Sequence, residues 1–506
     1  MLDERPAAEL APDTPEDAAP AATVASPPCR VDAISRDHLT CSLPAGADPD
    51  RELAEGLALA HRGLRAAILL PGAFERLPGP AGGRVRLRAR LPFDPGEETA
   101  RSKIDVQHAG TGAGLPNGHR KPLPRTRKAR ALVLIPAGAR YEHDRIRIHA
   151  WPMERIVGTY VNIGDLMVYD STLKVLDFET VEVGNITTFT DKDVDRYNAE
   201  FDFVFLRGSN FIHEYMDWQR TAELLSRLRL PVFAIGVGAQ AETRRAIDLP
   251  PEARRVWAAI ADHCAAIGVR GAYSAEVLEA NGIRNVDVVG CPSVFRTRDR
   301  DLALDLKPLH DVRRIAFSLR RETSPNYARD MERFTAIQKA FMLRLDEETA
   351  MTVTCHGEPE EKAYFFKDKS RIPAARDALR ESGWFDPENE PALEAIYRDR
   401  LFFNTTVQQY DDFIRTQDLA IGYRVHGVLP GLANGTPGIL VDYDERSAEL
   451  AETHRIPTVA EAELADGASW RDLYAPERFK PFTDAYRDGY DTMAGFLDRN
   501  GAPHRL

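Results

Sequence analysis

Short apolar runs alternate with longer amphipathic stretches along the chain after residue 130. In the first part of this region, the apolar runs are four to six residues long. Runs of that length, separated by segments with helical spacing, are typical of the buried strands of a parallel sheet. We therefore expect strands over Ala131–Ile135, Phe201–Leu206, Pro231–Gly236, Ala266–Val269 and Val286–Val289, and helices over Leu166–Phe178, Asp217–Leu228 and Pro251–His263.

A second alternating series follows a polar, charged connector that runs from Arg296 to Asp311. Its apolar runs and helical segments repeat the first pattern, which favours a second α/β unit. The expected strands are Arg314–Leu319, Met351–Cys355, Asp418–Gly422 and Gly438–Val441, and the expected helices are Arg329–Arg344, Tyr410–Thr416 and Val428–Asn434.

The two series together predict an α/β fold of two Rossmann-like parallel-sheet halves that face each other across a cleft. We place the N-terminal half at residues 131–300 and the C-terminal half at residues 301–450. The remaining segment, 451–506, reads as a C-terminal helical tail, because apolar residues in it recur at i+3 and i+4 steps. The residues of this stripe, which we expect to pack on the body of the protein, are Phe482, Tyr486, Tyr490, Met493 and Leu497.

The first 130 residues do not follow this pattern. Residues 1–28 are rich in Ala, Pro and acidic residues with almost nothing to bury, so we expect disorder. Residues 29–105 predict a small appendage, in which Arg51–Arg62 is compatible with a helix and Arg84–Leu91 alternates like a strand. Residues 106–130 read as a basic linker, suited either to peripheral contact with a membrane surface or acidic glycan or simply to solvation.

Composition narrows the class of protein. The 506 residues are 43% hydrophobic and 28% charged, which is ordinary for a globular protein, and the net charge of −12 argues against nucleic-acid binding. The five cysteines are widely separated and include no C-x-x-C pair, so neither a zinc site nor a disulfide framework is indicated. An acidic N-terminus without an apolar run, and the lack of a membrane-length segment elsewhere, predict a cytoplasmic protein at most associated with the inner face of the membrane.

The most informative polar residues follow the apolar run Asp418–Gly422. Arg424 and His426 come directly after it, and a small-residue helix pattern continues through Asn434. This order places both side chains beyond the carboxyl end of a buried strand, at a helix N-terminus. Open α/β sheets bind anions there, because free backbone N–H groups and the helix dipole favour negative charge. An Arg and a His at that point predict an anion site that contains a titratable group.

The same arrangement occurs twice more. Arg270 follows the run Ala266–Val269, and a helix opens near Ser274 and ends at an Asn-Gly capping signal. The next strand leads to Gly290-Cys291-Pro292-Ser293, and far upstream Asn162-Ile163-Gly164-Asp165 precedes an amphipathic helix. Sites this far apart in sequence predict a cleft that the fold assembles.

These segments resemble the polysaccharide pyruvyl transferase family, from about Arg155 to Leu450. The matching motifs are N-x-G-D at Asn162 to Asp165, the segment Val269 to Ser274, and R-x-H-G with a trailing G-T-P over Arg424 to Pro437. Members often have a run of glycines after the strand that corresponds to Phe201–Leu206, whereas this chain has Arg207-Gly208-Ser209-Asn210. The role of this loop in ligand binding therefore stays open.

The resemblance implies a GT-B-like arrangement of the two halves and a transferase activity. The implied donor is phosphoenolpyruvate, and the implied acceptor is a hydroxyl pair on a sugar, either free or on a lipid- or nucleotide-linked glycan. The product would be a cyclic pyruvate ketal on a cell-surface or exported glycan. No cofactor and no metal ion are implied.

The resemblance also implies roles for particular residues. Arg270 and Arg424 would bind the phosphate and carboxylate of phosphoenolpyruvate through bidentate guanidinium contacts. His426 would carry the acid–base chemistry, since imidazole titrates near working pH, and Asp165 is the second catalytic candidate. The remaining candidates for contact with the donor are Asn162, Gly164 and Ser293.

Structural alternatives remain for each of these side chains. Either arginine is also suited to cap a helix or pair with an acid, and His426 is also suited to hold a loop as a neutral ring. The N-x-G-D motif reads equally well as a helix N-cap and turn.

Other signals are discounted. Gly236-Val237-Gly238 lacks the third glycine of a dinucleotide fingerprint, and His213-Glu214 does not continue into a zinc motif. Cys355-His356-Gly357-Glu358 lies at an expected strand end, but one Cys-His pair is weak evidence for a metal or nucleophile.

Two other functions fit the same fold. One is a GT-B-like glycosyltransferase that uses a nucleotide sugar, with Arg270 and Arg424 holding its diphosphate. The other is a non-catalytic protein that binds or assembles glycans.

Overall fold

The computed structural model describes residues 123–124, 127–134, 157–158, 162–186, 188–214, 219–241, 243–321 and 330–506. It also describes the backbone of six N-terminal strands, at residues 30–34, 38–43, 57–61, 64–69, 74–77 and 85–90. The segment expected to be disordered, 1–28, lies outside the described residues, as does the basic linker 106–130 apart from residues 123–124 and 127–130.

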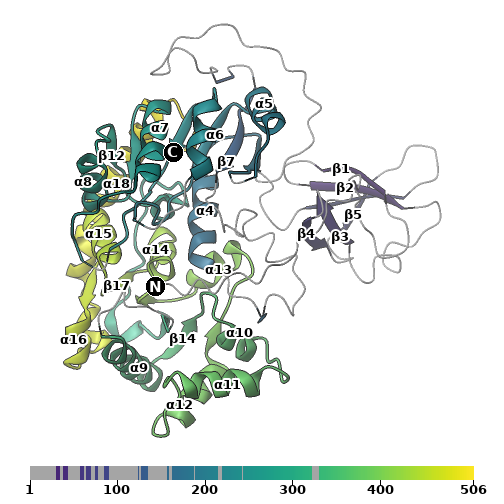
Figure 1. Ribbon diagram of the computed structural model, residues 1–506. Coiled ribbons are helices and arrows are strands. Elements are labelled where there is room, and N and C mark those ends of the chain that lie inside the picture. The colour runs from purple at the N-terminus through teal and green to yellow at the C-terminus, as the bar shows by residue number, and fades with distance from the viewer. Residues whose placement is uncertain are drawn as a thin grey trace.

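The N-terminal strands form a small antiparallel unit, drawn in purple in Figure 1. Four of them pair in the order β1-β2-β6-β5, and β3 pairs with β4. The helix expected over Arg51–Arg62 is wrong for residues 57–61, which form β3. Alanine favours helices, but Leu57-Ala58-Leu59-Ala60 also alternates with the period of a strand, and pairing with β4 decides the outcome. The bounds are Arg30–Ile34 (β1), His38–Leu43 (β2), Leu57–His61 (β3), Leu64–Leu69 (β4), Phe74–Leu77 (β5) and Val85–Arg90 (β6).

The N-terminal half contains a parallel sheet with helices between its strands. Its strands follow the order β8-β7-β9-β10, and an isolated parallel bridge from Val237 to Val269 joins the pair β11-β12 to them. The strands are Arg130–Leu134 (β7), Thr180–Gly184 (β8), Phe203–Leu206 (β9), Val232–Ala234 (β10), Ile267–Val269 (β11) and Val286–Val288 (β12). The helices are Ile163–Val175 (α4), Asp191–Glu200 (α5), Gln219–Arg227 (α6), Pro251–His263 (α7), Ala272–Ala280 (α8) and the 3₁₀ turn Pro292–Phe295 (η3).

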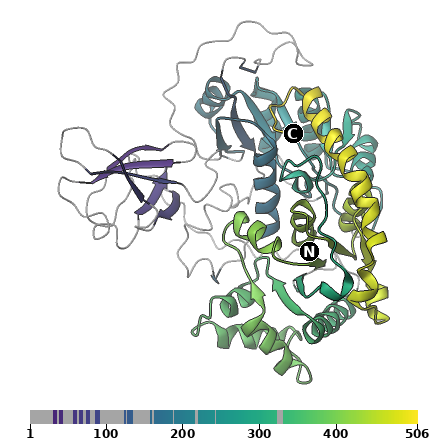
Figure 2. The same cartoon turned by 180° about the vertical axis from the view of Figure 1, so that it is seen from behind.

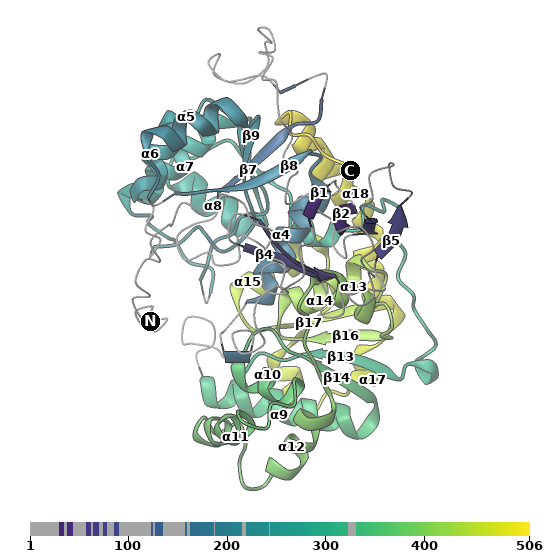
Figure 3. The same cartoon turned by 90° about the vertical axis from the view of Figure 1, so that its right-hand side faces the viewer.

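The C-terminal half is a six-stranded, fully parallel sheet in the order β15-β14-β13-β16-β17-β18. Figure 3 shows several of its strands side by side below the first sheet. The strands are Arg314–Ser318 (β13), Ala350–Thr354 (β14), Leu401–Phe402 (β15), Leu419–Gly422 (β16), Gly438–Asp442 (β17) and Thr458–Ala460 (β18). The helices are Leu309–Asp311 (η4, 3₁₀), Met331–Glu348 (α9), Pro359–Phe365 (α10), Ile372–Glu381 (α11), Glu390–Asp399 (α12), Val407–Ile414 (α13), Val425–Ala433 (α14) and Glu445–His454 (α15).

These two sheets confirm the predicted α/β fold of two Rossmann-like halves. Every strand expected from the two alternating series is present, within one to two residues at most ends. The segment 451–506 also contributes β18 to the second sheet, before Glu461–Ala465 (α16), Trp470–Leu473 (α17) and the long helix Pro476–Arg499 (α18). None of the helices that the structure describes combines the length and the apolar character needed to cross a membrane.

Helix α18 runs along both halves, as the yellow helix in Figure 2 shows. The predicted apolar stripe of α18 is buried, with Phe482 and Met493 at 1% and 0% exposure. Its residues join one hydrophobic cluster with side chains from α4, η3 and α14. The two halves therefore share a continuous core.

A buried ionic cluster links the halves at the same place. Arg296, at the end of η3, donates two hydrogen bonds to Asp411 on α13, at 3.0 and 2.7 Å, and one to Asp170 on α4 at 2.8 Å. Lys174 approaches Asp411 to 3.2 Å. Burial opposes ionisation of Asp411, but these cations lower its pKa well below the usual range. The two buried carboxylates of this cluster, Asp170 and Asp411, are thus paired with cations, as the burial of charge requires.

Candidate functional site

The carboxyl ends of the two sheets meet between the halves. In the C-terminal sheet the strand order reverses between β13 and β16, and in the N-terminal sheet it reverses between β7 and β9. Such switch points open a crevice beyond the strand ends where open α/β sheets bind ligands. Arg424 and His426 follow β16, and Arg207 follows β9. The predicted position of Arg424 and His426 beyond a strand end is therefore confirmed.

Helix α14 begins at the first switch point. Arg424 is its N-cap residue, and the Arg424 N–H donates to Ser318 Oγ at the end of β13, at 3.2 Å. The Arg424 guanidinium is buried, donates from Nε to the Leu319 carbonyl at 3.1 Å, and forms an ion pair with Glu358. His426 lies in the first turn of α14, where backbone N–H groups are free.

Gly427, the glycine of the R-x-H-G motif, lies where there is no room for a side chain. A methyl group on Gly427 would overlap the Ser318 side chain and lie 3.1 Å from His356 Nε2. Only glycine lets α14 approach β13 and β14 this closely.

Helix α4 brings the N-x-G-D motif to the same point. The Asn162 side chain caps the helix by accepting from Gly164 N–H at 3.1 Å and donates to Asp165 at 3.1 Å. The Ile163 N–H donates to the His356 carbonyl across the junction, at 3.0 Å. A methyl group on Gly164 would lie 3.5 Å from His426 Nδ1, so the first turn of α4 lies against the His426 ring. The helix-cap interpretation is confirmed, and it places the motif beside His426.

Arg270 is held by the protein on several sides. Its Nε donates to Glu449 on α15 at 2.8 Å, and its terminal nitrogens donate to Asn210 and to the Ala239 carbonyl. The same Glu449 carboxylate accepts from the Ser274 N–H at 2.6 Å and from the Ser274 hydroxyl at 3.0 Å. Glu449 thus ties Arg270 to the start of α8, which gives the Arg and the Ser of this segment a shared structural role. Three of the five guanidinium N–H groups are occupied by these contacts.

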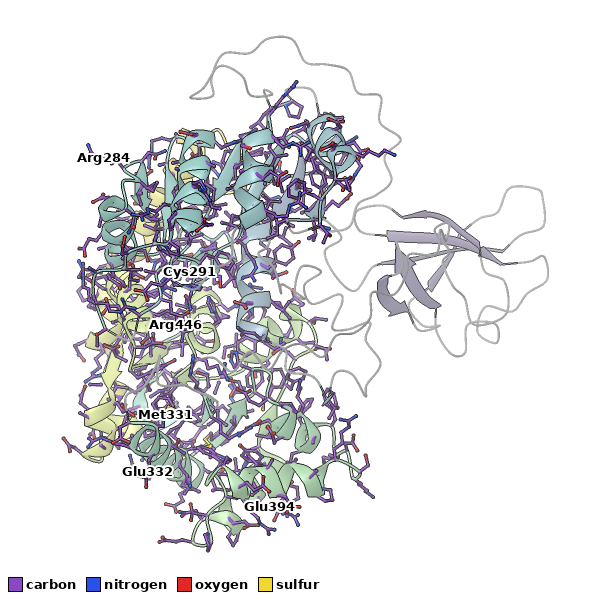
Figure 4. All side chains as sticks on the ribbon, viewed as in Figure 1. Arg284, Cys291, Met331, Glu332, Glu394 and Arg446 are labelled. Carbon is purple, nitrogen blue, oxygen red and sulfur yellow. The ribbon has the colours of Figure 1, made fainter. Side chains whose placement is uncertain are left out.

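Ser293 lies at the edge of this site. It follows Cys291, whose thiol is 3.6 Å from His426 Nε2 and whose N–H donates to His454 at 2.8 Å. Burial raises the pKa of the Cys291 thiol, while the neighbouring Ser293 hydroxyl and N–H lower it. Figure 4 labels Cys291 and, below it, Arg446, near the middle of the molecule.

The surroundings of His426 keep its imidazole neutral. Burial is the largest cause, and the positive charges of Arg446, Arg270, Arg207 and Arg296 add to it, lowering the pKa of His426 to about 3. Several guanidinium groups, each beside a carboxylate, thus lie near a neutral imidazole between two helix N-termini. Such a region attracts an anion, because helix dipoles and arginines act with the same sign.

Two residues that the sequence analysis left unassigned belong to this site. Arg207 is 3% exposed, and its guanidinium group lies 3.6 Å from the Asp165 carboxylate. Its position directly after β9 is the same signal that identified Arg270. His356 follows β14, and its ring reaches Gly427 at the start of α14. The sequence analysis noted the segment around His356, but that segment does not show which residues of the other half contact it.

Among the described residues, no three His, Cys, Asp or Glu side chains are grouped so that they could hold a metal ion.

Comparison with known proteins identifies one family. The model of a family described as polysaccharide pyruvyl transferase matches residues 162–445, more than half of the chain, and this range spans all the motif residues discussed above. A search of curated proteins returns no match.

Solved structures with low sequence identity resemble the fold. One is a UDP-N-acetylglucosamine 2-epimerase from Rickettsia bellii, with 11% identity over 74% of this chain and 96% of that one, at a TM-score of 0.38. Another is S. aureus MnaA with UDP, with 13% identity over 72% and 90%, at a TM-score of 0.34. A third is Anabaena Alr3699/HepE with UDP and glucose, with 10% identity over 74% and 95%, at a TM-score of 0.33.

Proposed function

Because the chain belongs to the polysaccharide pyruvyl transferase family, we propose that it transfers the pyruvyl group of phosphoenolpyruvate to two hydroxyl groups of a sugar. The product is a cyclic pyruvate ketal, and phosphate is released. The observation that carries this proposal is the neutral His426 between the N-termini of α4 and α14, surrounded by arginines.

The reaction adds one proton to a carbon atom of the donor and removes one proton from each of two sugar hydroxyl groups. A proton adds to the methylene carbon, and the adjacent carbon becomes oxocarbenium-like. One sugar hydroxyl attacks this carbon, the carbon–oxygen bond to phosphate breaks, and the second hydroxyl closes the ketal ring. One of the two hydroxyl protons balances the proton added to carbon, and the other leaves with phosphate.

His426 is suited to move these protons once the donor has bound. In the free protein, burial and the arginines favour the neutral ring. A donor that brings a phosphate and a carboxylate offsets the arginine charges and raises the pKa of His426 toward working pH. The imidazole then delivers a proton to the methylene carbon and recovers one from the attacking hydroxyl. Asp165, in the first turn of α4, is the second acid–base candidate.

The donor contacts follow from the same geometry. Arg270 keeps two N–H groups beyond its three protein contacts, which suits a bidentate contact with an anion. Arg424 contributes from the C-terminal half and Arg207 from the end of β9. The positive end of the α4 dipole at Gly164, the Asn162 side chain and the Ser293 hydroxyl complete the proposed contacts.

The acceptor is a sugar of a cell-surface or exported glycan, carried on a lipid or a nucleotide. We propose that the reaction takes place in the cytoplasm, with the basic segment 106–130 suited to contact with the inner face of the membrane. No resident cofactor or metal ion takes part in this proposal.

Calorimetry and thermal shift test the donor directly. We expect phosphoenolpyruvate to bind and to raise the melting temperature with concentration, as a ligand of the native state must. UDP- and GDP-sugars should not do so in the same range. Stabilisation by a nucleotide sugar but not by phosphoenolpyruvate would favour a glycosyltransferase instead. Phosphate release together with a pyruvate ketal, identified by mass spectrometry on the acceptor, completes the test.

A further inference from the structure

Two buried side chains around His426 keep polar atoms without the hydrogen-bond partners that burial normally demands. In the part of the chain that the structure describes, neither ring nitrogen of His356 has a hydrogen-bond partner, and neither does Nε of Arg207. Buried polar atoms are normally hydrogen-bonded, so two such side chains beside His426 favour a place where a ligand completes the hydrogen bonding.

His356 is the stronger case. Its residue is 1% exposed, so neither nitrogen is satisfied by bulk water. Leaving a buried polar group without a hydrogen-bond partner destabilises the folded protein, whereas an apolar ring of the same size carries no such penalty. Packing alone therefore gives no reason for a histidine at this position.

The position of His356 is fixed by both halves of the molecule. Its carbonyl accepts from Ile163 N–H at the start of α4, at 3.0 Å. Its Nε2 lies 3.1 Å from the place that a methyl group on Gly427 would take, at the start of α14. The ring is thus held between the two helix N-termini that meet at His426.

The charge state of the ring suits a donor of hydrogen bonds. Burial is the largest cause, and Arg424, His426 and Arg320 add to it, lowering the pKa of His356 well below the ordinary value. A neutral imidazole carries one N–H and one bare nitrogen. It donates to an anion without adding another buried charge to a site that already contains several arginines.

We propose that His356 contacts the bound donor directly, giving a hydrogen bond from its ring N–H to an anionic oxygen of the phosphate or carboxylate. The inference rests on the proposed function for the identity of the donor. It adds a binding residue from β14, beyond the arginines and His426 of the recognised motifs.

Two substitutions separate binding from packing. His356→Phe keeps an aromatic ring and removes the unsatisfied nitrogens, so we expect the free energy of unfolding in urea to stay equal or rise. We expect the same variant to bind phosphoenolpyruvate about 10- to 100-fold more weakly by calorimetry, the range for one hydrogen bond to a charged group. His356→Gln places an N–H near Nε2 and should recover most of that loss.

His263 provides the matched control. It is also buried, at the end of α7, but its two nitrogens lie 2.8 and 2.9 Å from the Leu230 and Leu225 carbonyls, and these contacts involve no motif residue. His263→Phe should lower stability and leave donor affinity unchanged. The same substitution is therefore expected to have opposite effects at the two histidines: weaker donor binding without loss of stability at His356, and lower stability without loss of donor affinity at His263.

The outcomes distinguish this inference from the proposed function. If the wild-type protein binds phosphoenolpyruvate and His356→Phe binds it equally well, His356 does not contact the donor, and the proposed function stands. If His356→Phe loses stability as His263→Phe does, with unchanged affinity in the folded fraction, the role of His356 is structural. If a nucleotide sugar binds in place of phosphoenolpyruvate and His356→Phe weakens it, the donor assignment falls and the contact at His356 remains.

Discussion

Each strand-end arginine of the motifs is held by a buried glutamate from a distant part of the chain. Arg270 pairs with Glu449, 179 residues later, and Arg424 pairs with Glu358, 66 residues earlier. Both carboxylates are nearly inaccessible, at 1% and 3% exposure. These pairs neutralise part of the arginine charge and set the direction of each guanidinium group, which a bidentate contact requires.

Removing the charge of Glu449 should therefore affect both stability and binding. Glu449→Gln keeps the size of the side chain but leaves Arg270 buried without its counter-ion. One of the groups that donate to the Glu449 carboxylate would then face the NH₂ group of the glutamine. We expect a loss of about 3–5 kcal/mol in the free energy of unfolding, the range for breaking a buried ion pair. Urea denaturation measures it.

The control is Glu452→Gln, on an exposed position of the same helix. Its effect should stay within about 0.5 kcal/mol, as for most surface substitutions. Equal stability of the two variants would show that the Arg270–Glu449 pair contributes nothing to the fold.

Donor binding should be coupled to proton uptake at His426. The pKa of His426 is lowered to about 3 in the free protein, so at pH 7 the ring is neutral. An anionic donor raises this pKa, so the complex holds more protons than the free components and affinity increases as pH falls toward 6. Calorimetry in buffers with different ionisation enthalpies measures the uptake.

His426→Gln should abolish that uptake while donor binding is largely kept. Turnover should fall by about 100- to 10,000-fold, the usual contribution of general acid–base catalysis. Proton uptake that persists in this variant would assign the titrating group elsewhere, with Asp165 and His356 next to examine.

At the scale of residues, the sequence predicts the position of a side chain at a strand end better than it predicts the side chain with which it pairs. Arg270, Arg424 and His426 stand after apolar runs, so their place at strand ends was visible. Their glutamate partners were not, because nothing local distinguishes Glu358 or Glu449 from exposed acids. Arg207 shows the same strand-end signal as Arg270 and was identifiable by the same argument.

At the scale of elements, the site depends on how closely α14 approaches the strands beneath it. Gly427→Ala adds a methyl group that overlaps Ser318 and crowds His356 Nε2. Because Ser318 belongs to β13, α14 has to shift, and we expect a loss of about 1–3 kcal/mol from overpacking together with weaker donor binding. Thermal unfolding and calorimetry measure both effects.

Gly495 on α18 is the matched control for this substitution. A methyl group there meets only the end of Arg499, at 3.5 Å. Gly495→Ala should stabilise the protein by about 0.5–1 kcal/mol, since alanine favours the helix interior. Stabilisation by both substitutions would mean that α14 tolerates a side chain at its first turn.

The elements that the sequence analysis missed include very short strands and also regular ones, such as β8 and the helices α5, α11, α12 and α15. Strand β15 has two residues and β18 three, too few to show a period. Helices α10, α11 and α12 form a long insertion between β14 and β15, where the strand alternation pauses. By contrast, α5 begins with a Thr190–Asp193 capping box that local reasoning was able to detect.

At the scale of the whole molecule, the N-terminal sheet begins before the boundary expected at residue 131. Arg130 starts β7 and is buried, and Arg127 donates to both oxygens of Asp202, at 2.7 and 3.0 Å. Asp202 is 1% exposed. The basic residues at the end of the expected linker thus hold the sheet together.

Two truncations test this boundary. A chain that starts at residue 123 keeps Arg127 and Arg130, so it should fold and retain turnover on a soluble acceptor. A chain that starts at Ala131 leaves Asp202 buried without its guanidinium partner and should lose about 3–5 kcal/mol of stability. Urea unfolding of the two chains compares them, and equal stability would place the boundary at 131 after all.

The return of α18 along both halves has a consequence for the order in which the protein can fold during synthesis. The Ala265 N–H in the first sheet's half donates to Asn500 at 2.9 Å, and the Arg505 N–H donates to the Val175 carbonyl at 2.8 Å. The N-terminal half therefore emerges from the ribosome first yet lacks these partners until the other half has been translated. Its incomplete surface stays exposed for that interval, during which chaperones and proteases compete with folding.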